Sequence, residues 1–178
     1  MYFIKVIILT LLLPAIIKIN VQPIKAIIMS YINIWIHMVW AIYCRHPYLT
    51  ENIRLKVFRH IKENAVKKNI HLDHVNGHLE HVHCLISLNA DQNIMTVANL
   101  IKGESSFWIN KNNLLKTRFA WQDDYFAESV SPLLIDNVRR YIRNQEEHHR
   151  KKSFQEEYEE FIRRRELNKV NNFREEKG

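Results

Sequence analysis

Residues 32–42 alternate between apolar and polar side chains, a pattern that predicts a long β-strand. Every even position from Ile32 to Ile42 is apolar, whereas Asn33 and His37 occupy odd positions. Because successive side chains of a strand point to opposite faces of a sheet, this spacing gives the strand one buried face.

A helix and a hairpin are predicted after this strand. Pro47 ends the strand, and Thr50 is the expected N-cap of a helix that continues to about Lys68. The buried stripe of this helix would consist of Leu55, Phe58, Ile61, Ala65 and Val66. Two short strands follow, the second at residues 81–88, and Asn76-Gly77 between them predicts a tight turn.

The second half of the chain adds three helices and a short stretch of strand. A helix is expected at residues 94–113, and one or two short strands at residues 121–130. Ser131-Pro132 combines an N-cap with proline at the first helical position, which predicts a helix to about His149. A charged helix at residues 154–167 follows, and we expect residues 168–178 to form a frayed tail.

The order β-α-β-β-α-β followed by extra helices predicts the fold class. It is typical of an α+β protein with the ferredoxin-like, or RRM-like, split βαβ arrangement, in which helices cover one face of an antiparallel sheet. Residues 29–167 are expected to form this single domain, with the C-terminal helices added to it.

Residues 1–28 differ from the rest of the chain. They contain three Lys and no acidic residue, and the apolar run from Val6 to Ile17 is short for a membrane span, which needs about 20 residues. No small-residue cleavage site follows the run. We therefore interpret this stretch as an extension outside the native domain, with Met29 as the natural start; a signal or anchor is the alternative.

Composition narrows the function classes further. A hydrophobic fraction of 47% excludes an intrinsically disordered protein, and a net charge of +7 favours polyanionic partners. Two cysteines are too few for a disulfide framework or a zinc ribbon, which favours a reducing compartment. We expect a cytoplasmic, nucleoid-associated protein with no small-molecule substrate and no membrane association. Ten histidines are many for this length.

His81 and His83 are the first candidates for chemistry. Two positions apart on a strand, they project side by side from one face of the sheet. Two imidazoles can occupy two positions around a divalent cation, and a third ligand must come from elsewhere. The alternative is a pair of half-exposed histidines without a ligand.

Tyr141 and Gln145 are the second pair of candidates, because residues four apart share one face of a helix. A phenol is a poor nucleophile at neutral pH unless its target is activated, and a cation that polarises a phosphoryl oxygen provides such activation. The side-chain carbonyl of Gln145 could supply an oxygen ligand. The alternative is that Tyr141 belongs to a buried stripe with Leu134 and Val138.

Basic residues surround this helix and predict contacts with phosphate. A solvated helix surface is the ordinary explanation of such a run. The expected nucleic-acid contacts around this helix are Arg139, Arg143, Arg150, Lys151 and Lys152, and Lys102 in the segment IKGESS is a further one.

Taken together, these motifs resemble the single-tyrosine HUH transposases of small insertion sequences, the IS200-like transposases, over residues 30–165. The resemblance rests on His81-Val82-His83, on residues 101–106 (IKGESS), on residues 127–131 (AESVS) and, above all, on residues 141–149 (YIRNQEEHH), followed by Phe154.

The resemblance implies that His81, His83 and Gln145 bind Mg²⁺ or Mn²⁺ and that Tyr141 is the nucleophile. The implied reaction cleaves and rejoins single-stranded DNA at the ends of an insertion sequence through a 5′-phosphotyrosine. It also implies recognition of DNA hairpins and a homodimer, and it leaves open whether Tyr141 acts in cis or in trans.

Two other functions are weighed against this one. A non-catalytic module that binds nucleic-acid hairpins on the same fold would not need Tyr141. A metal-dependent phosphodiesterase that uses water as the nucleophile would form no covalent intermediate. Tyr125 and Tyr158 are rival nucleophiles, and we expect both to be structural.

Overall fold

The strand predicted from the alternation is β1 (Ile34–Ala41), one of the two central strands of a four-stranded antiparallel sheet. The structure, a computed structural model, describes residues 31–175, and residues from Ile32 onward form one compact unit. The predicted extension at residues 1–28 lies outside the described residues. Within residues 31–175 no helix combines the length and the apolar character that crossing a bilayer requires.

The sheet has the strand order β2-β3-β1-β4. Its other members are β2 (His71–Gly77), β3 (His81–Leu88) and β4 (Phe126–Val130), and every neighbouring pair is antiparallel. This order is that of the split βαβ arrangement, so the predicted fold class is confirmed.

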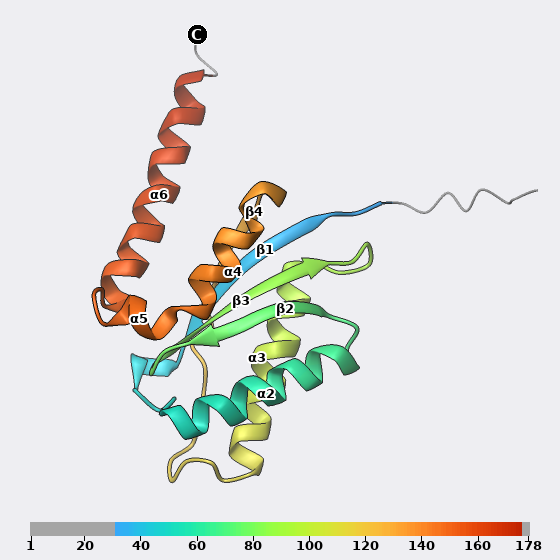
Figure 1. Cartoon of the computed structure of the whole chain (residues 1–178), viewed down its shortest axis with the longest axis vertical. Helices are drawn as coiled ribbons and strands as arrows, with labels where there is room; N and C mark the ends of the chain where they lie inside the picture. Colours follow the sequence, from blue (N-terminus) through green and yellow to red (C-terminus); the bar gives the residue numbers. More distant parts are fainter. Residues whose placement is uncertain (1–30, 176–178) are drawn as a thin grey trace, which may run out of the picture. The chain divides into compact units, whose positions relative to one another are not determined.

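One face of the sheet holds the main hydrophobic core. The even-numbered residues Met38 and Trp40 of β1 and Val82 and Cys84 of β3 are almost completely buried there. Helices α2 (Glu51–Lys67) and α3 (Ile94–Lys111) cover this face, as Figure 1 shows. The alternation of residues 32–42 therefore assigns the core-facing side chains of β1 correctly.

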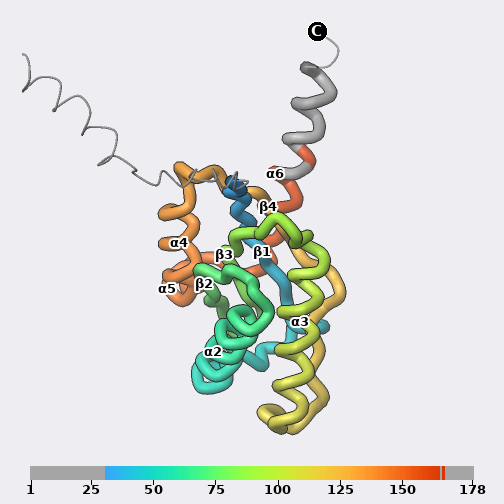
Figure 2. Tube along the Cα trace, turned by 90° about the vertical axis from the view of Figure 1, so that its right-hand side faces the viewer, coloured from blue at the N-terminus to red at the C-terminus, as the bar shows by residue number. Residues whose placement is uncertain are grey.

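The helices after β4 cover the opposite face of the sheet. The order of elements predicts helices on one face only, so this second layer is not predicted. After a 3-10 turn, η2 (Pro132–Leu134), the chain forms α4 (Ile135–Arg143), α5 (Gln145–His149) and α6 (Phe154–Glu175). Helices α4 and α5 pack against β2, and the perpendicular view in Figure 2 places them across the sheet from α3. Both faces of the sheet are thus shielded, and the odd-numbered residues of β1 and β3 lie beneath the C-terminal helices.

The turn between β2 and β3 differs from the prediction. Asn76 and Gly77 belong to β2, where they pair with His83 and Val82, and the connection is made by residues 78–80. Gly77 is required by close packing of the backbone, because a Cβ atom there would lie 2.1 Å from the carbonyl oxygen of His81. The glycine therefore marks a close approach beside the first residue of β3.

The helix predicted from Ser131 to His149 is divided at Asn144. In a continuous helix the Arg143 carbonyl would accept a bond from the backbone N–H four residues later. Here the side-chain amide of Asn76 donates to that carbonyl at 3.0 Å, and Asn144 has φ −96° and ψ 25°. A contact with β2, distant in sequence, therefore separates α4 from α5.

The buried stripe of α2 also differs from the prediction. Leu55 and Val66 are 59% and 79% exposed, whereas Arg54 and Val57 are buried. Arg54 is turned inward because it forms an ion pair with Glu146 of α5. An interaction between charged side chains thus helps to set which face of this helix is covered.

Candidate active site

His81 and His83 lie on the face of β3 that the C-terminal helices cover. Both side chains are completely buried, in contrast to the half-exposed pair of the alternative interpretation. The His81 ring stacks on the ring of Phe154 at the start of α6, with centroids 4.1 Å apart and planes 4° from parallel. This contact fixes the plane of the imidazole.

The break at Asn144 brings Gln145 to this pair. Gln145 is completely buried, and its Oε1 lies 3.3 Å from Nε2 of His81. His149, one turn later in α5, places its own Nε2 3.1 Å from the same oxygen and 3.0 Å from Nε2 of His81. Three potential metal-ligand atoms, one from β3 and two from α5, therefore lie within 3.3 Å of one another.

Glu157 of α6 provides a carboxylate to the same cluster. Its oxygens lie 3.7 Å from Nε2 of His83 and 3.6 Å from Nε2 of His149, and the residue is only 2% exposed. One potential ligand atom from each of His81, His83, His149 and Glu157 falls within 4.8 Å of every other. We call His81, His83, Gln145, His149 and Glu157 the polar cluster.

His37 of β1 orients His83 from the neighbouring strand. Nε2 of His37 lies 3.0 Å from Nδ1 of His83, and the two rings stack with centroids 5.2 Å apart. If Nδ1 of His83 carries the proton and donates it to His37, then Nε2 of His83 is a free acceptor that faces the polar cluster. Such a bond from the far side of an imidazole is the usual way to fix a metal-binding tautomer.

Burial sets the protonation states of these groups. It lowers the pKa of His37 to about 4, and it lowers the pKa of His81 and His83 well below the usual 6.5, helped by neighbouring imidazoles. Burial, with a smaller contribution from Glu160, raises the pKa of Glu157 to about 8. The imidazoles are therefore neutral, as metal ligands must be, and the carboxylate lacks a compensating charge.

The polar cluster fits a divalent cation. Both oxygens of Glu157 and Nε2 of His83 are buried without a hydrogen-bond partner, although such atoms are normally paired. Several pairs of these potential ligand atoms are 3.0–3.7 Å apart, the spacing of neighbouring ligands around one cation at bond lengths of about 2.0–2.2 Å. A mixed set of imidazole, amide and carboxylate ligands suits Mn²⁺ better than Mg²⁺, because imidazole favours transition metals.

Tyr141 lies beside the polar cluster within the same chain. Its ring centroid is 5.5 Å from that of His83 and 5.1 Å from that of His148, both in edge contacts. The side chain is half-buried and borders two hollows of about 390 Å³ and 350 Å³. The larger hollow is also lined by Glu157, so one cavity borders both the phenol and one residue of the polar cluster.

The basic residues predicted to contact nucleic acid differ in their exposure and in their partners. Arg143 is exposed at the end of α4. Arg150 and Lys151 are about three-quarters exposed, and both pair with Glu147 on the same surface. Lys152 pairs with Glu160 at the edge of the larger hollow.

Two other basic residues have partners within the fold. Arg139 makes a bidentate pair with Asp73 of β2, with both nitrogen–oxygen distances 2.9 Å, which ties α4 to the sheet. Lys102 is 9% exposed on the α3 side of the sheet, where its Nζ donates to the backbone carbonyls of Asp123 and Asp124. The structure does not bring Lys102 to the polar cluster, and its ammonium group is engaged in holding the loop before β4.

Sequence reasoning brings together His81, His83, Gln145 and Tyr141 but does not identify three contributors. His149 carried a usable signal, since it follows Gln145 by four residues and so shares its helix face. His37 stood on the odd face of β1, opposite the apolar stripe. Glu157 is one of many acidic residues in a charged helix, and nothing in the sequence marks it as buried.

The fold and the site define a class: an α+β protein with a split βαβ sheet that holds a tyrosine beside a buried His/Glu cluster suited to a cation. The chain belongs to the family described as Transposase IS200 like, whose sequence model matches residues 30–145. Membership implies a DNA endonuclease or strand transferase. No curated protein matches the chain.

Two solved structures share the fold. One is a protein of Deinococcus radiodurans R1 assigned as a transposase, with 21% identity, a TM-score of 0.54, and coverage of 65% of this chain and 93% of its own. The other is a REP-associated tyrosine transposase bound to a REP hairpin, with 19% identity, a TM-score of 0.50, and coverage of 68% and 72% respectively.

Proposed function

We propose that this protein cleaves and rejoins single-stranded DNA at the ends of an insertion sequence, with Tyr141 as the nucleophile. The observation that carries this proposal is the convergence of His81, His83 and Gln145 in one buried cluster, with the Tyr141 ring 5.5 Å from that of His83. Membership of the transposase family independently supports DNA as the substrate.

In this proposal the polar cluster holds the cation. His81, His83 and Gln145, together with His149 and Glu157, would bind Mg²⁺ or Mn²⁺, which when bound polarises a phosphoryl oxygen and neutralises charge that develops on it. Glu157 supplies the single negative charge of the set. His37 keeps His83 in the orientation in which Nε2 faces the cluster.

Tyr141 cleaves the DNA strand by forming a covalent bond to its phosphate, and the reverse reaction rejoins the strand. Its phenolic oxygen loses a proton and forms a bond to phosphorus, while the bond from phosphorus to the 3′-oxygen breaks and that oxygen takes up a proton. The products are a 5′-phosphotyrosine and a free 3′-hydroxyl. Because the phosphotyrosine is itself a phosphodiester, attack by a 3′-hydroxyl reverses the reaction without an external energy source.

DNA contacts are proposed for the exposed basic surface around α5. Arg143, Arg150 and Lys151 are exposed around α5, where they can neutralise backbone phosphates, and Lys151 lines the smaller hollow beside Tyr141. A hairpin is the proposed form of the DNA, and the complex of a structurally similar protein with a REP hairpin supports it. We omit Lys102 from this surface because its ammonium group is buried.

A covalent-adduct assay tests the proposed reaction. The full chain is incubated with labelled single-stranded DNA that carries the element's ends and with Mn²⁺, and the products are separated on a denaturing gel. We expect a shifted protein–DNA band that is lost in Tyr141→Phe and retained in Tyr125→Phe and Tyr158→Phe. Cleavage without a shifted band would indicate a water-dependent phosphodiesterase, and binding alone would indicate a non-catalytic module.

We further propose that Tyr141 acts on the site of its own chain, because its ring already contacts His83 there. A homodimer would supply the two nucleophiles that excision of both ends requires. Mixing Tyr141→Phe with His83→Ala distinguishes cis from trans action. Each variant alone should be inactive, and adduct formation by the mixture would show that the tyrosine of one chain serves the cluster of the other.

A further inference from the structure

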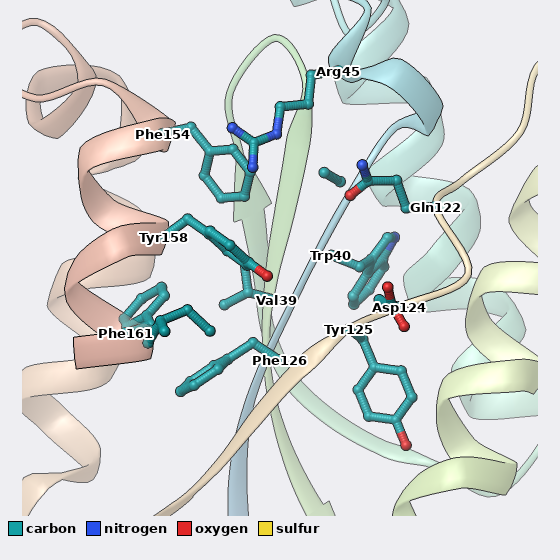
Figure 3. A pocket seen from close by; sticks show the side chains of 12 residues that line it. Val39, Trp40, Arg45, Gln122, Asp124, Tyr125, Phe126, Phe154, Tyr158 and Phe161 are labelled. Carbon is teal, nitrogen blue, oxygen red and sulfur yellow. The ribbon is translucent and has the colours of Figure 1, made fainter. Parts of the chain in front are cut away.

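A separate hollow lies on the other side of Phe154 from the polar cluster. It has a volume of about 300 Å³, which is at the lower end of the range for small-molecule sites. Figure 3 shows Phe154, Tyr158 and Phe161 of α6 on one side of it and Gln122, Asp124 and Tyr125 on the other. None of these side chains takes part in the reaction proposed above.

The walls of this hollow suit a flat aromatic ligand. Phe126 stacks on Phe161 with ring centroids 4.6 Å apart, and together they form one end of the hollow. Tyr158 is 38% exposed, so its ring is accessible from solvent. Across from the rings, the amide of Gln122 and the carboxylate of Asp124 can form hydrogen bonds with the edge of such a ligand. Stacking surfaces combined with polar groups at the edge are how proteins hold an unstacked nucleobase.

Arg45 gives the hollow a positive charge at its rim. Its guanidinium lies 5.3 Å from the centre of the Phe154 ring and 5.4 Å from that of Tyr158. The backbone of Cys44 and Arg45 is left-handed, with φ values of 55° and 53°, in the 3-10 turn η1 (Tyr43–Arg45) after β1. Two successive residues other than glycine in this conformation are strained, and such strain tends to occur where a side chain is held for binding.

The hollow adjoins the proposed reaction site. Val39 and Ala41 of β1 line it, and they are the cross-strand partners of His83 and His81. Neighbouring strands lie about 5 Å apart, so the hollow is one strand away from the polar cluster. Phe161 lines both this hollow and the larger one that contains Tyr141 and Glu157.

We propose that this hollow binds an unpaired base of the DNA strand, next to the phosphate that Tyr141 attacks. The base stacks on the ring of Tyr158, its edge meets Gln122 and Asp124, and Arg45 contacts its phosphate. The position of the base relative to the attacked phosphate rests on the proposed function, whereas binding of a base with its 5′-phosphate does not.

Fluorescence of 2-aminopurine tests the binding. The probes are 2-aminopurine deoxyriboside, its 5′-monophosphate, and a thymidine hexanucleotide with 2-aminopurine at a central position, titrated with full-length Tyr141→Phe protein so that no cleavage occurs. We expect quenching of the emission on binding. Tyr158→Ala should weaken binding of the hexanucleotide about tenfold, which corresponds to about 1.4 kcal/mol and lies within the range for stacking of one base.

Three comparison variants make the result specific. In the same Tyr141→Phe background, Tyr158→Phe keeps the ring and should bind normally, whereas Phe107→Ala removes an exposed ring from α3 on the far side of the sheet and should change nothing. Arg45→Gln should weaken binding of the monophosphate but leave that of the phosphate-free nucleoside unchanged. The proposal would be overturned if Tyr158→Ala quenched the emission as strongly as the parent Tyr141→Phe protein. It would also be overturned if Tyr158→Ala and Phe107→Ala lost the same binding affinity.

The adduct assay separates this inference from the proposed function. If wild-type protein forms the Tyr141 adduct but 2-aminopurine is not quenched, the base site is refuted and the reaction stands. If 2-aminopurine is quenched in a manner that depends on Tyr158 while no adduct forms, the base site stands and the reaction is refuted.

Discussion

Replacing Glu157 with glutamine should make the metal-free protein more stable at neutral pH. The carboxylate is 2% exposed, neither of its oxygens has a hydrogen-bond partner, and burial raises its pKa to about 8 from an ordinary 4.5. Glutamine has the same shape and carries no charge. The substitution therefore removes the cost of keeping a buried acid protonated at a pH where the unfolded chain is ionised, and it leaves the packing unchanged.

The sign and size of the effect follow from proton linkage. The folded state holds a proton on Glu157 that the unfolded state has lost above pH 4.5, so wild-type stability falls as the pH rises from about 4.5 to about 8. A pKa difference of about 3.5, at about 1.4 kcal/mol per pH unit, limits the loss to about 5 kcal/mol, of which about 3 kcal/mol is present at pH 7. The buried histidines act equally in both proteins and cancel in the comparison.

Chemical denaturation of both proteins in the presence of a chelator, from pH 4.5 to pH 8.5, measures this difference. The Glu157→Gln curve should lie above the wild-type curve by a margin that grows with pH. Adding Mn²⁺ should then stabilise the wild type, by about 2.7 kcal/mol at a concentration 100 times its Kd, and the variant much less. A constant difference across the pH range, or equal stabilisation of both proteins by Mn²⁺, would refute the assignment of Glu157 to a cation site.

Three further predictions concern metal binding, folding stability and DNA binding. His37→Phe keeps the ring but removes the bond that orients His83, and should weaken Mn²⁺ binding in a titration by about tenfold or more; unchanged affinity would exclude this role. Gly77→Ala places a methyl group 2.1 Å from a backbone carbonyl and should lower the free energy of unfolding by about 2 kcal/mol or more. Arg150→Gln should reduce the slope of log affinity for single-stranded DNA against log salt by about 1, whereas Lys56→Gln, on α2, should leave it unchanged.

Local patterns predict the sheet well because they depend on the geometry of single strands. The alternation in β1 and the spacing of His81 and His83 each follow from a repeat of two residues, which needs no knowledge of the partner strands. The order of elements then gives the topology, and the family resemblance joins Gln145 and Tyr141 to the histidine pair.

The C-terminal part of the site depends on contacts between distant residues. A helical repeat alone predicts one continuous helix through Asn144, and the break arises from the bond between Asn76 and the Arg143 carbonyl. That break directs Gln145 and His149 into the cluster. The burial of Glu157 depends in turn on how α6 packs over the sheet, which no local pattern in a charged helix specifies.

Mass spectrometry of the trapped covalent product identifies the residue that attacks the DNA. Wild-type protein is incubated with single-stranded DNA and Mn²⁺, digested with nuclease and protease, and the modified peptide is sequenced. We expect a single modified residue, Tyr141, that carries the 5′-phosphate of a nucleotide. A nucleotide attached to Tyr125 or Tyr158, or cleaved DNA with every tyrosine unmodified, would contradict it.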